Sequence, residues 1–321
     1  FGRATGGVVN MVTKSGSNEW RGGATLTYAP EALRSHAPQA FSAGGSGVSG
    51  ATIYNRMASL ETLDTSVYLS GPILKDRLFF FALVNPRSTK EYFAMASQGL
   101  SGNNLHTGVQ TYNKTTSPRW LAKLDLNITD TQRLEATLFS DKSETQQVFL
   151  NRDARTGVTG QGLGYTENAG GFNQIYKYTG AFTDWFTLSA LYGKQTSSQE
   201  DTGPLVGVPR IRDRRTTTTS FLTAANTVVP LQPVGEDTRA TYRLDADFYV
   251  RGLLGDHHIR VGYDKEELRS SDVHAYNGGY FMDIFNRVPT GTNLPAQPYA
   301  LKTVLGSGGE DSAEQTAIYA Q

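Results

Sequence analysis

Residues that could carry out chemistry are few in this sequence, and their spacing does not gather them into a site. His257 and His258 are adjacent, so on a strand they point to opposite faces and cannot bind one metal together. The run 125–136 begins like a calcium-binding loop but lacks the glycine and the final glutamate that such a loop needs. The glycines of 160–164 do not have the spacing of a dinucleotide fingerprint. We therefore predict no catalytic residue, no metal site and no cofactor, and we expect a protein that is not an enzyme.

Composition narrows the class of protein further. The 321 residues include no cysteine, 30 basic and 30 acidic side chains, 34 glycines and 11% aromatic residues. Balanced charge argues against a nucleic-acid partner, and the lack of cysteine excludes disulfides and thiolate metal sites. No apolar run reaches the roughly 18 residues that a transmembrane helix requires. If this chain crosses a membrane, it must do so with strands.

Alternation of apolar and polar residues is the dominant pattern along the chain. It is clearest in 239–251, where Tyr242, Leu244 and Phe248 have one parity and the charged residues have the other. Such a period of two predicts strands with one apolar side. The same pattern predicts strands at 119–128, 133–138, 176–182, 186–192 and 259–264, with less regular ones at 22–29, 64–73 and 77–86. Phe79, Phe80 and Phe81 place aromatic rings on both faces of the last of these, which indicates a strand lying against interior material.

The links between these strands alternate between short and long. Short links are predicted at 74–76, 129–131, 183–184 and 253–256, and long loops at 30–63, 87–116, 146–170, 201–236 and 271–312. Soluble domains rarely contain so many long loops at one end, whereas outer-membrane barrels combine short periplasmic turns with long external loops. We predict an all-β, antiparallel transmembrane β-barrel fragment of nine strands plus the start of a tenth at 313–321.

Charge decides which face of these strands would point to lipid. A Lys or Arg facing the middle of a bilayer costs about 2–4 kcal/mol, so the charged parity is predicted to face the barrel lumen. The predicted lumen-facing residues are Lys123, Asp125, Arg133, Glu135, Arg243, Asp245, Asp247 and Arg260. The opposite parity would contact outer-membrane lipid, and the three tryptophans would lie in interfacial belts or, alternatively, in an ordinary core.

The opening residues carry a resemblance to a known family. Phe1 to Gly22 resembles the last plug strand of TonB-dependent receptors and the passage into their first barrel strand; the matching residues are Gly6, Gly7, Val8 to Val12, Thr13, Lys14, Gly16, Trp20 and Gly22. A second stretch, 70–81, contains Gly-Pro, a Lys-Asp turn and a run of three phenylalanines. It resembles the second hairpin of the Oar-like branch.

This resemblance implies a domain division and a function. Residues 1–19 would be the C-terminal end of the plug domain, and residues 20–321 would be the N-terminal part of a barrel that is expected to have 22 strands. The whole protein would import a scarce ligand, such as a siderophore, vitamin-like compound, peptide or glycan, across the outer membrane of a Gram-negative bacterium. The TonB complex would be a partner through a Ton box upstream of Phe1, and further strands would follow Gln321.

Aromatic residues suggest where a small extracellular ligand could bind. Tyr276, Tyr280, Phe281 and Phe285 lie in the segment predicted to be the last long loop. They would either contact a ligand at the barrel mouth or fold the loop back on itself. Two other functional classes remain open: a passive porin-like or adhesin barrel without energy coupling, and a soluble all-β binding protein.

Overall fold

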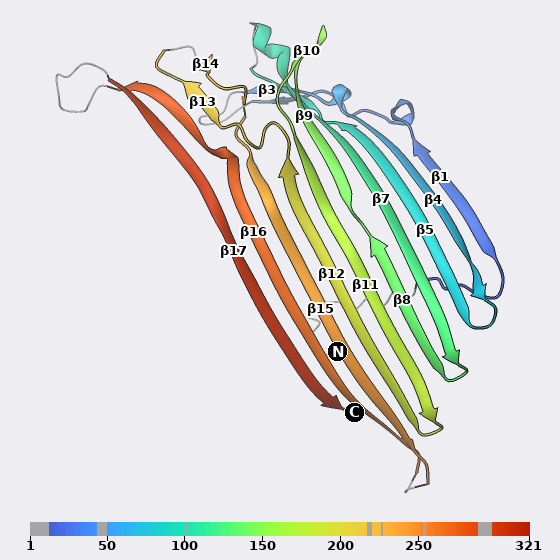
Figure 1. Ribbon diagram of the computed structural model, residues 1–321. Coiled ribbons are helices and arrows are strands. Elements are labelled where there is room, and N and C mark those ends of the chain that lie inside the picture. The colour runs from blue at the N-terminus through green and yellow to red at the C-terminus, as the bar shows by residue number, and fades with distance from the viewer. Residues whose placement is uncertain are drawn as a thin grey trace.

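One large β-sheet makes up the protein. The computed structural model describes residues 13–43, 50–99, 102–216, 220–225, 227–252, 255–287 and 297–321. The seventeen strands found in these ranges belong to a single sheet, shown in Figure 1 as a row of long, inclined strands. The ten long strands are β1 (Arg21–Ala29), β4 (Ser59–Leu74), β5 (Leu78–Tyr92), β7 (Thr107–Thr129), β8 (Gln132–Ser140), β11 (Tyr165–Thr183), β12 (Phe186–Thr202), β15 (Pro230–Val250), β16 (His257–Arg287) and β17 (Gln297–Ala320). The predicted all-β class is confirmed.

The remaining elements lie in the links between these ten strands. They are β2 (Ala40–Ser42), β3 (Ala51–Tyr54), β6 (Met95–Ser97), β9 (Ser143–Asp153), β10 (Gly157–Gln161), β13 (Arg210–Asp213), β14 (Ser220–Phe221), and the 3-10 turns η1 (Glu31–Leu33), η2 (Asn55–Met57) and η3 (Gly102–Leu105). Of these, β9 has 11 residues and the others have five or fewer. Figure 1 shows the labelled short strands gathered at one end of the sheet. Within the described ranges, no helix has the length and apolar character needed to span a bilayer.

The long strands form an antiparallel meander. Each pairs with the next in the order β1, β4, β5, β7, β8, β11, β12, β15, β16, β17, and β9 continues the ladder of β8 by pairing with β7 and β11. Tight turns close β4–β5, β7–β8 and β11–β12 at one end, which we call the turn end; the opposite end is the loop end. In the first of these turns Asp76 adopts a left-handed conformation with φ of 62°. The predicted short links are therefore confirmed, although residues 253 and 254 of the last one lie outside the described ranges.

The strands are longer than alternation predicts. Many residues that were expected to lie in loops instead form hydrogen-bonded strands at the loop end. For example, β16 extends to Arg287, β17 begins at Gln297, and β7 begins at Thr107. The tenth strand thus spans Gln297–Ala320 rather than starting at Ala313. The physical reason is that backbone pairing continues where neither face of the sheet needs to be apolar, so the side-chain pattern disappears while the hydrogen bonds persist.

Strand register separates the side chains cleanly onto two faces. Glu135, Lys177, Leu191 and Arg243 stand opposite one another on successive strands β8, β11, β12 and β15. Directly opposed residues share a face, so these four belong to one continuous face, which we call the polar face. The other face, the apolar face, leaves Leu124 44% and Leu244 45% exposed, which no sealed protein interior would do.

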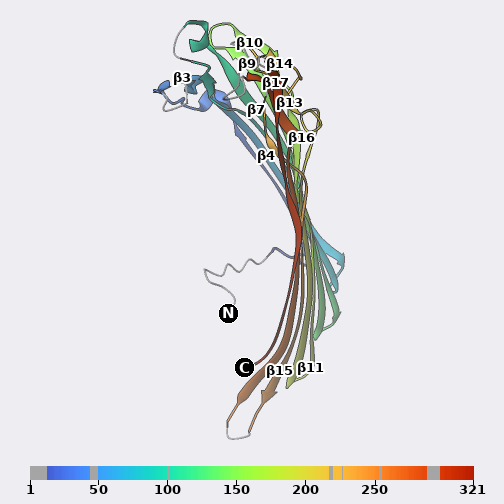
Figure 2. The ribbon, with the colours of Figure 1, turned by 90° about the vertical axis from the view of Figure 1, so that its left-hand side faces the viewer.

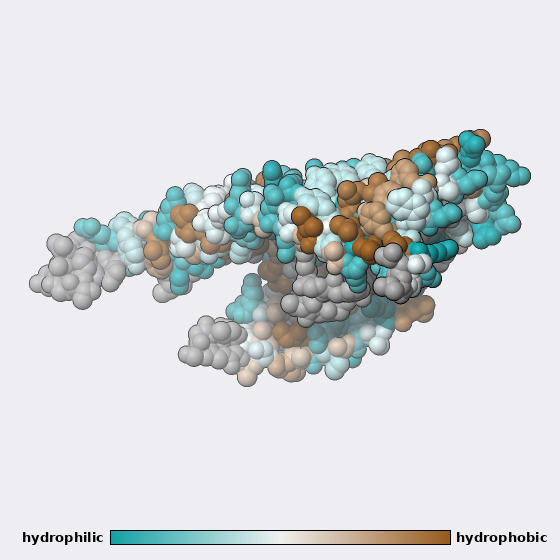
Figure 3. All heavy atoms as spheres, turned by 90° about the horizontal axis from the view of Figure 1, so that it is seen from below, coloured by the Kyte–Doolittle hydropathy of each residue, from teal (hydrophilic) through white to brown (hydrophobic). Residues whose placement is uncertain are grey.

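The sheet is curved and is not closed among the described residues. Edge-on, it forms an arc (Figure 2), and viewed from below it bends around a central hollow (Figure 3). Within the described pairings, β1 is bonded only to β4, and β17 only to β16. Both therefore present an unpaired edge, which is a strong driver of association with further strands.

Candidate functional site

The first polar cluster joins β7 and β8. Its members are Lys123, Asp125, Arg133 and Glu135, all of them predicted from the sequence. Arg133 Nη2 lies 2.7 Å from Asp125 Oδ1, and its Nε lies 3.1 Å from Glu135. Lys123 Nζ lies 3.6 Å from Asp125 and 3.5 Å from Glu135. Asp125 and Lys123 are 1% and 7% exposed, whereas the Arg133 side chain is 45% exposed. The buried charges are tolerable because the cluster holds two positive and two negative groups.

The chain before β1 lies against this cluster. Lys123 Nζ donates a hydrogen bond of 2.8 Å to Ser15 Oγ, 108 residues earlier in the sequence. Gly16 packs on β5 so closely that a Cβ there would lie 2.9 Å from Phe79 Cβ and would collide with the Phe80 carbonyl oxygen. Figure 2 shows this segment meeting the concave side of the sheet. The polar face is therefore the concave one, and the phenylalanine strand contacts a segment from outside the meander on this face.

The other predicted junction residues divide between the two faces. Lys14 Nζ lies 5.1 Å from the centre of the Tyr68 ring, and Thr13 is half-buried. Trp20 contacts Phe80 edge-on at 5.5 Å on the apolar face and is 62% exposed. Gly22 of β1 stands opposite Leu69 of β4. Gly6 and Gly7 lie outside the described residues. The segment therefore passes from the polar face to the apolar edge at the turn end.

The second polar cluster joins β15, β16 and β17. Asp247 accepts hydrogen bonds from Arg260 Nε at 2.8 Å and pairs with His258 Nε2 at 2.7 Å. Arg243 Nε donates to Asp245 at 2.9 Å, and Tyr319 bridges these two residues through its hydroxyl group. The sequence predicted the four acidic and arginine residues together.

Two members of this second cluster were missed from the sequence. His258 was considered only as half of a histidine pair, and it instead stacks on Tyr249 at 4.6 Å while bonding Asp247. Tyr319 was placed in a strand but not on a face. Tyr319 stands opposite Gly262 on β16, and Gly262 stands opposite Asp245 on β15. Tyr319 therefore lies on the polar face, and the alternation along its strand was the signal that could have shown this. The eight predicted polar residues thus share one face but form two separate groups.

Aromatic rings mark two levels on the apolar face. Near the turn end, Trp185 and Phe186 contact Phe248 at 6.4 and 5.2 Å. Higher on the same strands, Tyr192 lies 6.2 Å from Tyr176 and 5.2 Å from Tyr242. Phe186 and Tyr192 are separated by about 20 Å of strand at roughly 3.4 Å per residue. Because the strands of outer-membrane barrels tilt by about 35–45°, this length corresponds to a height of about 15 Å, which fits within their apolar band of roughly 25 Å.

The predicted aromatic ligand loop is wrong in its local structure. Tyr276, Tyr280, Phe281 and Phe285 all lie in β16, which continues as a ladder with β17 through this segment. A bulge at Gly278 and Gly279, with φ of 64° and 79°, shifts the alternation, so that the four rings do not share one face. The loop assignment failed because a strand with water on both sides needs no apolar face, so its glycine and polar residues do not distinguish it from a loop.

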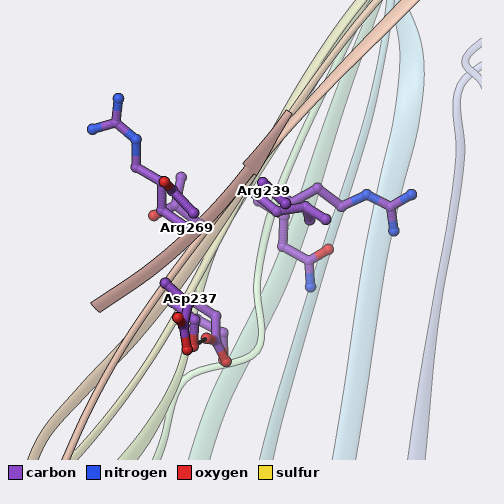
Figure 4. A pocket seen from close by; sticks show the side chains of 11 residues that line it. Asp237, Arg239 and Arg269 are labelled. Carbon is purple, nitrogen blue, oxygen red and sulfur yellow. Dashed lines mark hydrogen bonds between the residues drawn. The ribbon is translucent and has the colours of Figure 1, made fainter. Parts of the chain in front are cut away.

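A shallow hollow in the sheet gathers charged residues without enclosing a site. Its lining includes Asp237, Arg239 and Arg269 from β15 and β16. Figure 4 shows Arg239 and Arg269 pointing to opposite sides of the ribbon. Residues on opposite faces cannot act on one bound molecule, so this hollow is no candidate active site. Among the described residues there is also no group of three or more acidic or histidine side chains placed to hold a metal.

The comparisons with known proteins point in one direction. The chain is 27% identical to the TonB-dependent transporter Oar of Myxococcus xanthus, over 345 aligned positions that cover 88% of this chain and 32% of that protein. The resemblance seen in the opening residues is thus confirmed: this chain is a relative of an Oar-type TonB-dependent transporter. The chain spans about a third of the relative's length. No family model and no solved structure matches it.

Proposed function

We propose that this chain is part of an energised transporter of the bacterial outer membrane. Residues 1–19 are the end of its plug domain, and residues 20–321 are the first part of its barrel, which further strands complete. The polar face lines the lumen and the apolar face contacts lipid. The similarity to the Oar transporter supports transport as the general function of the protein.

The observation that carries the proposal is the packing of residues 13–18 on the concave polar face. A passive pore needs an open lumen, whereas here a segment from outside the meander lies on Lys123 and on the backbone of β5. At the turn end Asn18 bonds both the side chain and the backbone amide of Asp76. Interior material held at several points is what a plugged, gated barrel requires.

The apolar face supports an outer-membrane location. On β12 and β15 the aliphatic residues Leu188 and Leu244 lie between two levels of aromatic rings, and beyond the upper level charged residues appear on this face. Lys265 there pairs with Glu267 at 2.8 Å and with Glu314 at 3.2 Å. Charges are tolerated above the hydrocarbon and not within it.

Ligand uptake in the presence and absence of TonB tests the proposed function. The full-length protein, expressed in a strain that lacks its own copy, should fractionate with the outer membrane and confer uptake of the cognate compound. The candidates are siderophores, vitamin-like compounds, peptides and glycans. Deletion of TonB should abolish uptake without changing the amount of protein in the membrane. Uptake that persists without TonB would contradict energy coupling and favour a passive barrel.

A further inference from the structure

An unusual strand pairing at the loop end assembles three arginines. β13 runs parallel to β16, with Arg210 opposite Phe281 and Arg212 opposite Asp283. The ladder continues through Arg214, whose backbone amide donates to the Ile284 carbonyl at 2.7 Å. Residues two apart on a strand share a face, so the three arginines at 210, 212 and 214 project together.

These three guanidinium groups surround a single carboxylate. Arg212 binds Asp283 through both oxygens, at 2.7 and 2.5 Å. Arg214 Nη1 lies 3.5 Å from the same carboxylate, and Arg210 Nη2 lies 4.0 Å from it. One negative charge therefore faces three positive charges. The Arg212–Asp283 pair is saturated by its bidentate geometry, which leaves the two outer arginines with donors to spare.

Burial makes this excess of charge costly. The Arg210 side chain is only 16% exposed, and its Nε is buried without a hydrogen-bond partner among the described residues. Burial, followed by the charge of Arg212, lowers the pKa of Arg210. A buried donor without a partner carries the full cost of its desolvation. An anion bound between the arginines would remove that cost.

Two phenylalanine rings hold the outer guanidinium groups in place. Arg210 lies over the Phe281 ring at 4.9 Å, and Arg214 lies over the Phe285 ring at 5.1 Å. Phe285 in turn stacks on Tyr299 of β17 at 5.4 Å. A guanidinium group lying flat on a ring keeps its N–H edge available for a planar oxyanion.

The cluster lies on the concave, polar face. Phe281 and Phe285 stand opposite Thr303 and Tyr299 on β17. These odd residues share the face of Tyr319, because β17 runs without interruption from Gln297 to Ala320. The bulge on β16 is what turns its odd residues to this side. A lipid phosphate would approach from the apolar face, so the position favours an anion from the aqueous phase.

We propose that Arg210, Arg212 and Arg214, held by Phe281 and Phe285, form a binding site for the oxyanion group, carboxylate or phosphate, of a soluble ligand. The site lies at the loop end on the polar face. It rests on the proposed transport function only in that this ligand would be the imported compound or a part of it. Binding itself requires neither TonB nor transport.

Calorimetric titration of the full-length protein in detergent tests this site, with phenyl phosphate and benzoate as probes at low salt. The wild-type protein should bind at least one of the two probes. The double variant Arg210→Gln with Arg214→Gln should bind it at least about tenfold more weakly, because two charge-assisted donors are lost. Arg215→Gln is the matched control: Arg215 pairs with Asp213, 2.6 Å away, and its loss should change affinity less than about twofold.

A variant that is expected to strengthen probe binding separates loss of the site from misfolding. Asp283→Asn removes the carboxylate that pairs with all three arginines among the described residues, so it should strengthen probe binding by about threefold or more. A double variant that misfolds would lose the heat-dependent shift of its band in gel electrophoresis. Weakening in the double variant together with strengthening in Asp283→Asn cannot arise from loss of fold alone.

Three results would overturn the site. In the first, the wild-type protein binds neither probe. In the second, the double variant binds the probe as tightly as the wild-type protein does. In the third, the arginine substitutions change only the amount of lipopolysaccharide phosphate that copurifies with the protein. The last result would assign the cluster to a lipid headgroup. If uptake still required TonB in any of these cases, the transport proposal would stand while the anion site fell.

Discussion

The two polar clusters are built from the same residue types yet differ in their surroundings. In the first cluster the side chains of Lys123 and Asp125 are only 8% and 2% exposed, because residues 13–18 cover that part of the face, although Arg133 is 45% exposed. Around Asp245, the partner Arg243 has a side chain 45% exposed, and among the described residues no segment from outside the meander bonds to it. One alternating pattern therefore produces a cluster with a buried cation, Lys123, where a segment covers it, and a cluster whose basic side chains all reach water where none does.

The largest difference between the two clusters should appear in the free energy of unfolding when one acid is removed from each. Asp125→Ala removes one of the two carboxylates that Lys123 and Arg133 share and leaves one positive charge of this cluster without a counter-charge. Because Lys123 is buried, we expect a loss of about 3–5 kcal/mol in the free energy of unfolding. Asp245→Ala should cost only about 0–1 kcal/mol, since water screens Arg243. Urea titration of the full-length protein in detergent, followed by tryptophan fluorescence, measures both. Equal losses would mean that the cover over the first cluster has no energetic effect.

The cover itself can be lifted at Gly16. A Cβ at this position collides with the Phe80 carbonyl oxygen, so Gly16→Ala should displace the segment and cost about 1–3 kcal/mol. Limited proteolysis after residues 14 and 21 should then become faster, and acrylamide should quench Trp20 more strongly. Gly207→Ala is the control, because a Cβ there meets nothing within 4 Å. Unchanged proteolysis in Gly16→Ala would show that the segment is not held at this point.

The smallest effect concerns acids at the loop end, outside the apolar band. Glu167 and Asp201 stand opposite each other; burial raises the pKa of both, and the charge of Asp201 further raises that of Glu167. The folded state then binds more protons than the unfolded state. Stability of this segment should therefore rise as the pH falls through the raised pKa values, with the gain complete below the unfolded values of 4.5 and 3.8.

A nearby aspartate should show the opposite dependence. Hydrogen bonds from Arg155 lower the pKa of Asp153 to about 2, so its contribution is present above 3.8 and is lost as the pH falls toward 2. Hydrogen exchange between pH 7 and 4, corrected for intrinsic rates, should slow for amides 165–169 and not for 150–155. Glu167→Gln should remove most of the dependence. Exchange at 165–169 that is indifferent to pH in the wild-type protein would contradict the assignment.

The predictability of the strands changes with their distance from the apolar band. Within it, the parity of Leu124, Leu244 and their neighbours identified strands, faces and turns, because one side of each strand must be apolar. Beyond it, β13 and the upper parts of β16 and β17 were missed, because both sides contact water and no rule constrains their side chains. The aromatic residues Phe281 and Phe285 were recognised as candidates but were assigned to a loop.

The sequence by itself determined the all-β class, the meander, the division of residues between two faces and the relationship to TonB-dependent receptors. These follow from local alternation and from an ordered motif. Only the tertiary structure decided that Ser15 meets Lys123, that Tyr319 joins the second cluster, and that Arg210 and Arg214 converge near Asp283. Each of those contacts joins residues 69 or more positions apart in the chain, and neither periodicity nor composition records which distant strands a bulge or a parallel pairing brings together.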